Sequence, residues 1–128
     1  MASFETPVLR PIFWMGNSKR NLQAFPEGAQ KLIGDELQLL QFGGMPKDAK
    51  PFKGAGSGVV EIALRYDTDA YRTVVAVQLG KKIYVLHAFQ KKSKTGIKTS
   101  EQDVDLIKQR YAAAKELAKH EQEKPQTH

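Results

Sequence analysis

Three stretches of alternating apolar residues, separated by very short turns, most constrain the fold of this chain. They span residues 59–66, 71–79 and 82–89, and only Asp67–Ala70 and Gly80–Lys81 lie between them. Connections this short join antiparallel neighbours, because a parallel pair of strands needs a crossover of a dozen or more residues. The pattern therefore predicts a three-stranded antiparallel meander.

Strict alternation assigns side chains to the two faces of each predicted strand. In 59–66, the even-numbered residues are apolar, whereas Glu61 and Arg65 lie on the more polar face. In 82–89, both faces are largely apolar, which indicates a central strand. Alternation there predicts two sets, with Tyr84, Leu86 and Ala88 on one face and Ile83, Val85, His87 and Phe89 on the other.

Helical signals occur on both sides of the meander. Asn17 or Ser18 can cap a short helix over 19–25, and Pro26 stops it and suits the first turn of a second helix. Gly43 and Gly44 end that second helix. Its apolar stripe comprises Ala29, Leu32, Ile33, Leu37 and Leu40. This stripe predicts a helix that packs on the sheet.

A last helix is predicted after Thr99 or Ser100, where a capping residue precedes early acidic residues. It should run to about Lys119. Its apolar face comprises Val104, Ile107, Tyr111, Ala114 and Ala118. The segment 121–128 is polar and is expected to be a disordered tail, whereas residues 1–120 should form a single domain.

Two further segments complete the expected order of elements. Residues 8–15 have strand character, but Pro11 cannot donate a hydrogen bond to a sheet, so an edge strand is expected there. Residues 43–58 are rich in Gly, Pro and Lys and are expected to form a long loop. The predicted fold is α+β: an N-terminal strand, two helices, a three-stranded antiparallel meander and a C-terminal helix packed on the sheet.

Positive charge is concentrated in one part of the chain. The 20 Lys and Arg exceed the 14 Asp and Glu by six, and residues 81–98 contain six lysines and no acidic residue. Subtracting those six lysines leaves 14 basic residues, which equals the number of acidic ones. One basic segment on an otherwise neutral protein favours a polyanion as partner, although isolated surface lysines also serve solubility alone.

Composition excludes several classes of site. There is no cysteine, so disulfides, thiolate metal clusters and thiol nucleophiles are excluded. The histidines lack the spacing that seats zinc on a helix, and no metal or other cofactor is expected. No apolar run approaches the roughly 18 residues of a membrane span. We expect a cytoplasmic protein without a membrane partner.

Several residues are candidates for chemistry, each with a structural alternative. Phe89 beside Lys91 could stack on an unpaired base or belong to the core. His87 could act as an acid or base, although we favour a packed side chain. Glu61 could be a general base, but a structural partner for Arg65 is the favoured interpretation.

Three segments together resemble a known family. Lys50 to Arg65 (KPFKGAGSGVVEIALR), Tyr71 to Val77 (YRTVVAV) and Ile83 to Ser93 (IYVLHAFQKKS) resemble the phage-related HigB-like branch of the RelE/ParE toxin superfamily. The resemblance covers about residues 8–117 and implies a RelE-like fold. It also implies the toxin of a type II toxin–antitoxin pair, a ribosome-dependent mRNA endoribonuclease. In RelE-like toxins a 2′-hydroxyl attacks the adjacent phosphate without a metal.

The resemblance also implies roles for individual residues. Arg72 matches the strand arginine that binds phosphate, Lys92 matches a basic residue that stabilises the transition state, and Arg65 matches the arginine of the E-x-x-x-R pattern. Lys91 is a companion of Lys92. Further RNA contacts are expected from Lys50, Lys53, Phe89, Lys94 and Lys98. The general base is open among Glu61, His87 and a lysine of lowered pKa.

The expected partners are mRNA, the ribosome and a cognate antitoxin with a helix-turn-helix domain. Two other functions stay open, since fold alone does not fix function. One is a non-catalytic, ParE-like gyrase inhibitor, and the other is a phage-derived RNA-binding accessory protein. The concentrated basic segment favours RNA.

Overall fold

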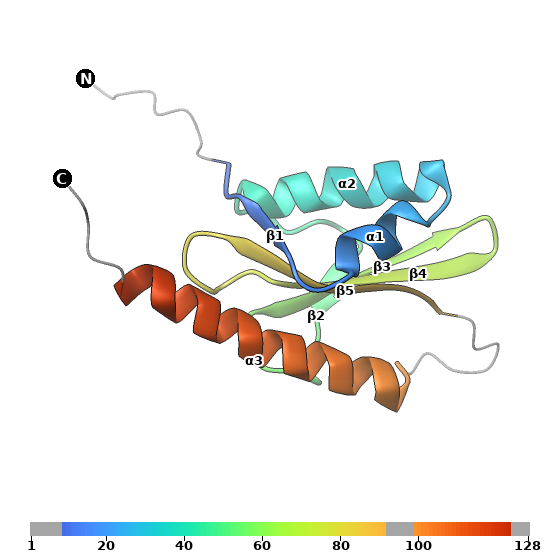
Figure 1. Ribbon diagram of the computed structural model, residues 1–128. Helices are drawn as coiled ribbons and strands as arrows, with labels where there is room; N and C mark the ends of the chain where they lie inside the picture. The colour runs from blue at the N-terminus through green and yellow to red at the C-terminus, as the bar shows by residue number, and fades with distance from the viewer. Residues whose placement is uncertain (1–8, 92–98, 124–128) are drawn as a thin grey trace, which may run out of the picture.

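The computed structural model describes residues 9–91 and 99–123. Two helices, α1 and α2, cover one face of a five-stranded sheet, and α3 covers the other (Figure 1). The elements are β1 (Ile12–Trp14), α1 (Ser18–Gln23), α2 (Glu27–Gln41), β2 (Ala49–Pro51), β3 (Val59–Tyr66), β4 (Asp69–Ala76), β5 (Ile83–Lys91) and α3 (Glu101–Glu123). None of the helices in the described part is both long enough and apolar enough to cross a membrane.

The sheet has the strand order β1-β5-β4-β3-β2. The predicted meander β3-β4-β5 is confirmed as antiparallel, and β1 is the expected edge strand, parallel to β5. The expectation of a long loop over 43–58 was wrong in one part, because Ala49–Pro51 forms the short edge strand β2 against Val60–Ile62. A strand of three residues is too short to show an alternating hydrophobic pattern, so it could not be recognised in the sequence. Its final proline is tolerated because β2 lies at the edge of the sheet.

A two-residue turn fixes the register of β3 and β4. Asp67 and Thr68 both have positive φ angles, 51° and 70°, as a type I′ hairpin requires. The turn is shorter than predicted, since β4 already begins at Asp69. It places Arg65 opposite Ala70. The hairpin therefore sets which residues lie side by side on each face.

A β-bulge in β5 changes the face that its last residues occupy. Val74 lies opposite His87 and Val75 lies opposite Val85, which leaves Leu86 without a partner. The predicted alternation was therefore wrong beyond Leu86, because one extra residue reverses the later side chains. Ala88 packs with Ile83 and Val85 towards α1 and α2. His87 and Phe89 instead lie towards α3, together with Tyr84 and Leu86.

The apolar stripe of α2 packs on the sheet as predicted, with one exception. Ala29, Ile33, Leu37 and Leu40 are buried. Leu32 is 44% exposed, which corrects its assignment to the stripe. At about 100° per residue it lies roughly a quarter turn from the centre of the buried positions. This layer forms the larger of the two cores.

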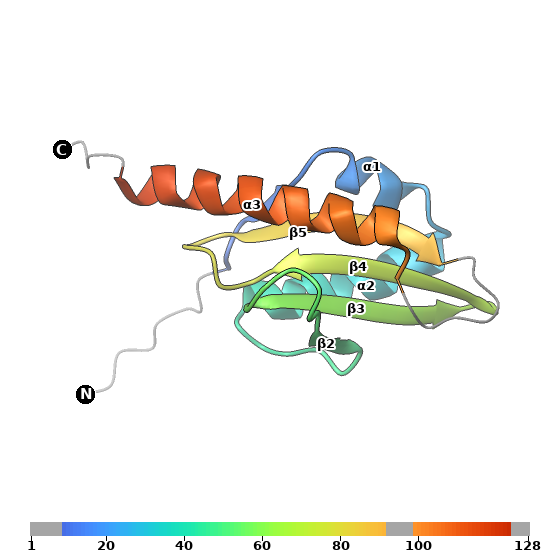
Figure 2. The ribbon, with the colours of Figure 1, turned by 90° about the horizontal axis from the view of Figure 1, so that it is seen from below.

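Helix α3 covers the other face and runs across β5 and β4 (Figure 2). Its predicted apolar face is confirmed, with Ile107, Ala114 and Ala118 buried. Ser100 is the capping residue, because its Oγ accepts a hydrogen bond from the Asp103 backbone N–H at 3.2 Å. The helix continues to Glu123, beyond the end expected near Lys119, and Glu121 in this extra turn pairs with Lys82.

Candidate functional site

The strand register gathers most of the predicted site residues on the α3 side of the sheet. Residues directly opposite each other in neighbouring strands share a face. Lys50 of β2 lies opposite Glu61, Arg72 lies opposite Phe89, and Ala70 lies between Arg65 and Lys91. We call six of the residues on this face the cationic face: Lys50, Glu61, Arg65, Arg72, Phe89 and Lys91.

The centre of the cationic face is a buried ion pair. Arg72 Nη1 donates a hydrogen bond to Glu61 Oε2 at 2.8 Å, and the two side chains are only 9% and 6% exposed. Glu61 therefore pairs with Arg72 from the neighbouring strand, which corrects the favoured pairing with Arg65. The interaction fixes the direction of the guanidinium group and occupies one of its five donors. The carboxylate is committed to holding Arg72 in place.

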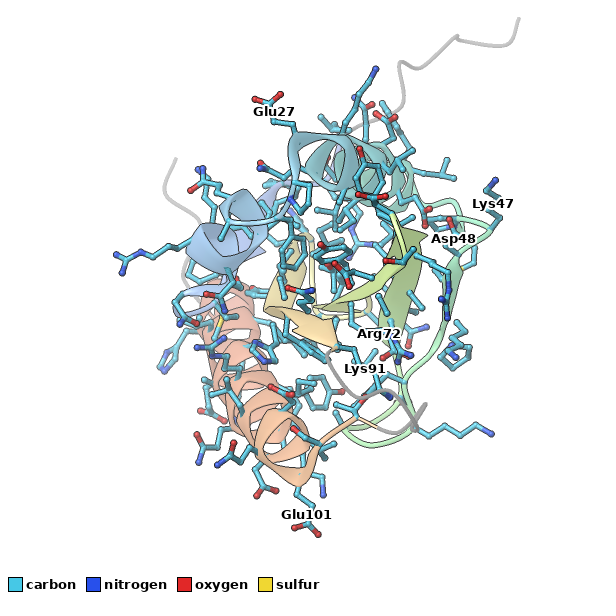
Figure 3. All side chains as sticks on the ribbon, turned by 90° about the vertical axis from the view of Figure 1, so that its right-hand side faces the viewer. Glu27, Lys47, Asp48, Arg72, Lys91 and Glu101 are labelled. Atoms are coloured by element: carbon cyan, nitrogen blue, oxygen red, sulfur yellow. The ribbon has the colours of Figure 1, made fainter. Side chains whose placement is uncertain are left out.

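Lys91 lies beside this pair at the end of β5 (Figure 3). Its Nζ is buried and has no hydrogen-bond partner among the described residues. Burial lowers the pKa of Lys91, and the positive charge of Arg72 lowers it further. The charge of Glu61 acts in the opposite direction, and that of Lys50 adds to the lowering. Lys91 therefore matches the predicted candidate, a lysine of lowered pKa.

Arg65 and Arg72 line one small hollow beside the β3–β4 turn. It has a volume of about 170 Å³, and Ala63, Leu64 and Ala70 complete it. Arg65 is exposed, whereas Arg72 reaches the hollow from the buried pair. The β3–β4 hairpin thus brings the two arginines to one hollow. Two guanidinium groups on one concave surface form a favourable place for an oxyanion.

His87 is held inside the protein by α3. Its Nε2 lies 2.8 Å from Asp103 Oδ1, and Ser100 Oγ donates a hydrogen bond to Asp103 Oδ2 at 2.8 Å. The residue is 5% exposed, and Nδ1 is buried without a partner among the described residues. Its ring stacks on Phe89 at 4.7 Å between centroids. His87 presents little surface to a ligand, whereas Phe89 is half-buried.

The remaining predicted residues are not brought to this surface by the described part of the chain. Lys53 is exposed in the loop that follows β2. Lys92, Lys94 and Lys98 lie outside the described residues. Asp103 was missed as a site residue, because its acidic side chain already explained the start of a helix. No local signal in the sequence links it to His87, which lies 16 residues earlier.

The sheet order and the helices on its two faces define a RelE-like α+β protein, and its distinctive feature is the cationic face. The chain belongs to the family described as phage-derived protein Gp49-like (DUF891), whose model matches residues 20–112. No curated protein matches the chain. The matched segment contains every residue of the cationic face and points to a phage-related or toxin-like function.

Proposed function

We propose that this protein is a HigB-like toxin of a type II toxin–antitoxin system and that it cleaves mRNA on the ribosome. One observation carries the proposal: the cationic face joins an oxyanion hollow to a lysine whose pKa is lowered. Transfer of a phosphoryl group needs positioned cations for the phosphate and a group that takes a proton. The choice of ribosome-bound mRNA as the substrate follows from the family resemblance.

In the proposed reaction, a 2′-oxygen of the RNA forms a bond to the adjacent phosphorus while the bond to the 5′-oxygen breaks. The products are a 2′,3′-cyclic phosphate and a 5′-hydroxyl, and the 5′-oxygen takes its proton from solvent. Arg65 and Arg72 hold the phosphate oxygens and stabilise the added negative charge. Lys92 matches the basic residue of the family that stabilises the transition state, and we assign it the same role.

Lys91 is the proposed proton acceptor. Among the three candidates, Glu61 is committed to Arg72, and His87 has both ring nitrogens inside the protein. The Nζ of Lys91 also has no hydrogen-bond partner among the described residues, and it lies beside Arg72 of the cationic face. A neutral amine there takes the proton of the 2′-hydroxyl as the new bond forms.

The proposal includes partners that follow from the same family. A cognate antitoxin with a helix-turn-helix domain neutralises the toxin, and the target is the translating ribosome in the cytoplasm. Exposed cations at Lys50 and Arg65 contribute to RNA binding through phosphate contacts. Such contacts predict affinity that falls steeply as the salt concentration rises.

The direct test is primer extension on purified ribosomes programmed with a defined mRNA. The proposal predicts discrete stops within codons after addition of the purified protein, and none on the same mRNA without ribosomes. A supercoiling assay with purified gyrase runs in parallel. Inhibition of gyrase without mRNA cleavage would refute the proposal in favour of the ParE-like function.

A further inference from the structure

A second, larger concavity lies on the opposite side of the sheet from the cationic face. It is a groove of about 570 Å³ between the end of α1 and the ends of β4 and β5. Its principal lining residues are Asn21, Phe25, Pro26, Asp69, Tyr71 and Gln90. The groove exists because β1 pairs only with Ile83–Val85, so the last part of β5 has no strand beside it on that edge in the described structure.

The lining of this groove differs in charge from the cationic face. Among the described residues, no Lys or Arg contributes to it, and its one formal charge is the carboxylate of Asp69. A phosphate is therefore disfavoured there. Two carboxamides, from Asn21 and Gln90, supply further donors and acceptors. A carboxylate between two amides suits a group that offers hydrogen-bond donors.

Two packed aromatic rings lie at the floor of the groove. The rings of Phe25 and Tyr71 pack at 4.7 Å between centroids, and Pro26 forms part of the wall. A flat heteroaromatic ring fits a wall of this kind, with its polar edge directed to the side chains at the rim. Guanine meets this requirement, because N1–H and the N2 amino group can donate to one carboxylate while O6 accepts from an amide.

The position of the groove connects it to the cationic face. Gln90 and Lys91 are adjacent in β5, and neighbouring residues of a strand point to opposite faces. A single strand of RNA that passes the open edge of β5 can therefore place a phosphate near Lys91 and a neighbouring base near Gln90. The two surfaces would then hold successive parts of one nucleic acid.

We infer that the groove between α1 and β5 is a base-binding subsite selective for guanine, with Asp69 and Gln90 as the residues that read the base. This inference rests on the proposed function for the identity of the polymer. The chemistry of the groove itself does not depend on cleavage. The subsite would determine sequence preference, whereas the cationic face would carry out the reaction.

The test is an NMR titration of the whole protein with guanosine and, separately, with uridine. Nucleosides lack a phosphate, so the cationic face contributes nothing to their binding. The inference predicts that guanosine shifts the amide signals of Asn21 and Gln90 and that uridine binds more weakly. Asp69→Asn should weaken guanosine binding about tenfold, since a charged acceptor is lost. Asp67→Asn, in the turn directly before β4, is the matched control and should change nothing.

Equal responses to the two nucleosides, or shifts located away from the groove, would overturn the inference. No response to either nucleoside would also overturn it. Guanosine binding without mRNA cleavage would count against the proposed function alone. Cleavage without guanosine binding would count against this inference alone.

Discussion

The buried ion pair between Arg72 and Glu61 contributes to the stability of the protein, so a change in either residue can affect folding as well as activity. An Arg72→Ala change leaves the Glu61 carboxylate buried without its partner, which is expected to cost about 3 kcal/mol of unfolding free energy. The double change Glu61→Gln with Arg72→Gln should recover most of that loss. Urea denaturation of both variants measures the difference. A single variant as stable as the parent would show that the pair contributes nothing.

The same pair shows what could be predicted residue by residue. The position of Arg65 and Arg72 in neighbouring strands could be predicted from the short turn between them, whereas their common face comes from the observed register. The choice of Arg72 as the partner of Glu61 did not follow. The pairing depends on the register of β3 and β4, which makes Glu61 and Arg72 diagonal neighbours, and on the burial of both side chains. Neither can be read from local spacing in the sequence.

At the scale of elements, the meander and the helices were predictable because hydrophobic periodicity and short turns act locally. The β-bulge at Leu86 could not be predicted. Both faces of this strand are largely apolar, so an extra residue does not disturb the hydrophobic pattern of the sequence. The bulge turns His87 towards α3, where its Nε2 lies within hydrogen-bond distance of Asp103 Oδ1. Bulges of this kind re-aim side chains beside functional sites.

The contact between β5 and α3 yields a prediction. Asp103→Ala removes the partner of a buried histidine, whereas Glu101→Ala removes only a neighbouring acidic residue from the same first turn of α3. Asp103→Ala should therefore destabilise the protein by about 1–2 kcal/mol more than Glu101→Ala. Equal losses in chemical denaturation would mean that the helix dipole alone explains the effect.

Helix α2 and the segment before β2 are joined by an acidic pair that makes stability depend on pH. Burial and the neighbouring Asp48 raise the pKa of Glu36 from 4.5 to about 7. Between these values the folded protein binds more protons than the unfolded chain, so the free energy of unfolding falls as the pH rises. Below pH 4.5 the carboxyl group is protonated in both states and the effect disappears.

Glu36→Gln should consequently stabilise the protein at pH 8, by on the order of 1 kcal/mol, and have no effect at pH 4. Asp35→Asn, at the exposed neighbouring position of α2, is the control and should leave the pH dependence unchanged. Thermal or urea unfolding at the two pH values checks this. The prediction fails if both variants follow the parent across the range.

At the scale of the whole molecule, the net charge of +6 is explained in part by cations that the fold gathers on one surface. The basic segment 81–98 contributes Lys91 to a surface whose other cations come from β2, β3 and β4. The sequence showed that the charge was concentrated. It could not show that Lys91 would be buried beside Arg72, since that depends on how β4 and β5 pair. The electrostatic coupling that lowers its pKa exists only in the assembled sheet.

Replacement of Lys91 tests the central claim most directly. In single-turnover assays on programmed ribosomes, Lys91→Met should reduce the rate of mRNA cleavage by at least about 100-fold, the usual contribution of a general base. Lys31→Met, which removes the same charge from α2 on the other side of the sheet, should retain the rate of the parent. A Lys91→Met protein that is folded and cleaves mRNA within threefold of the parent rate would contradict the proposed role of the cationic face.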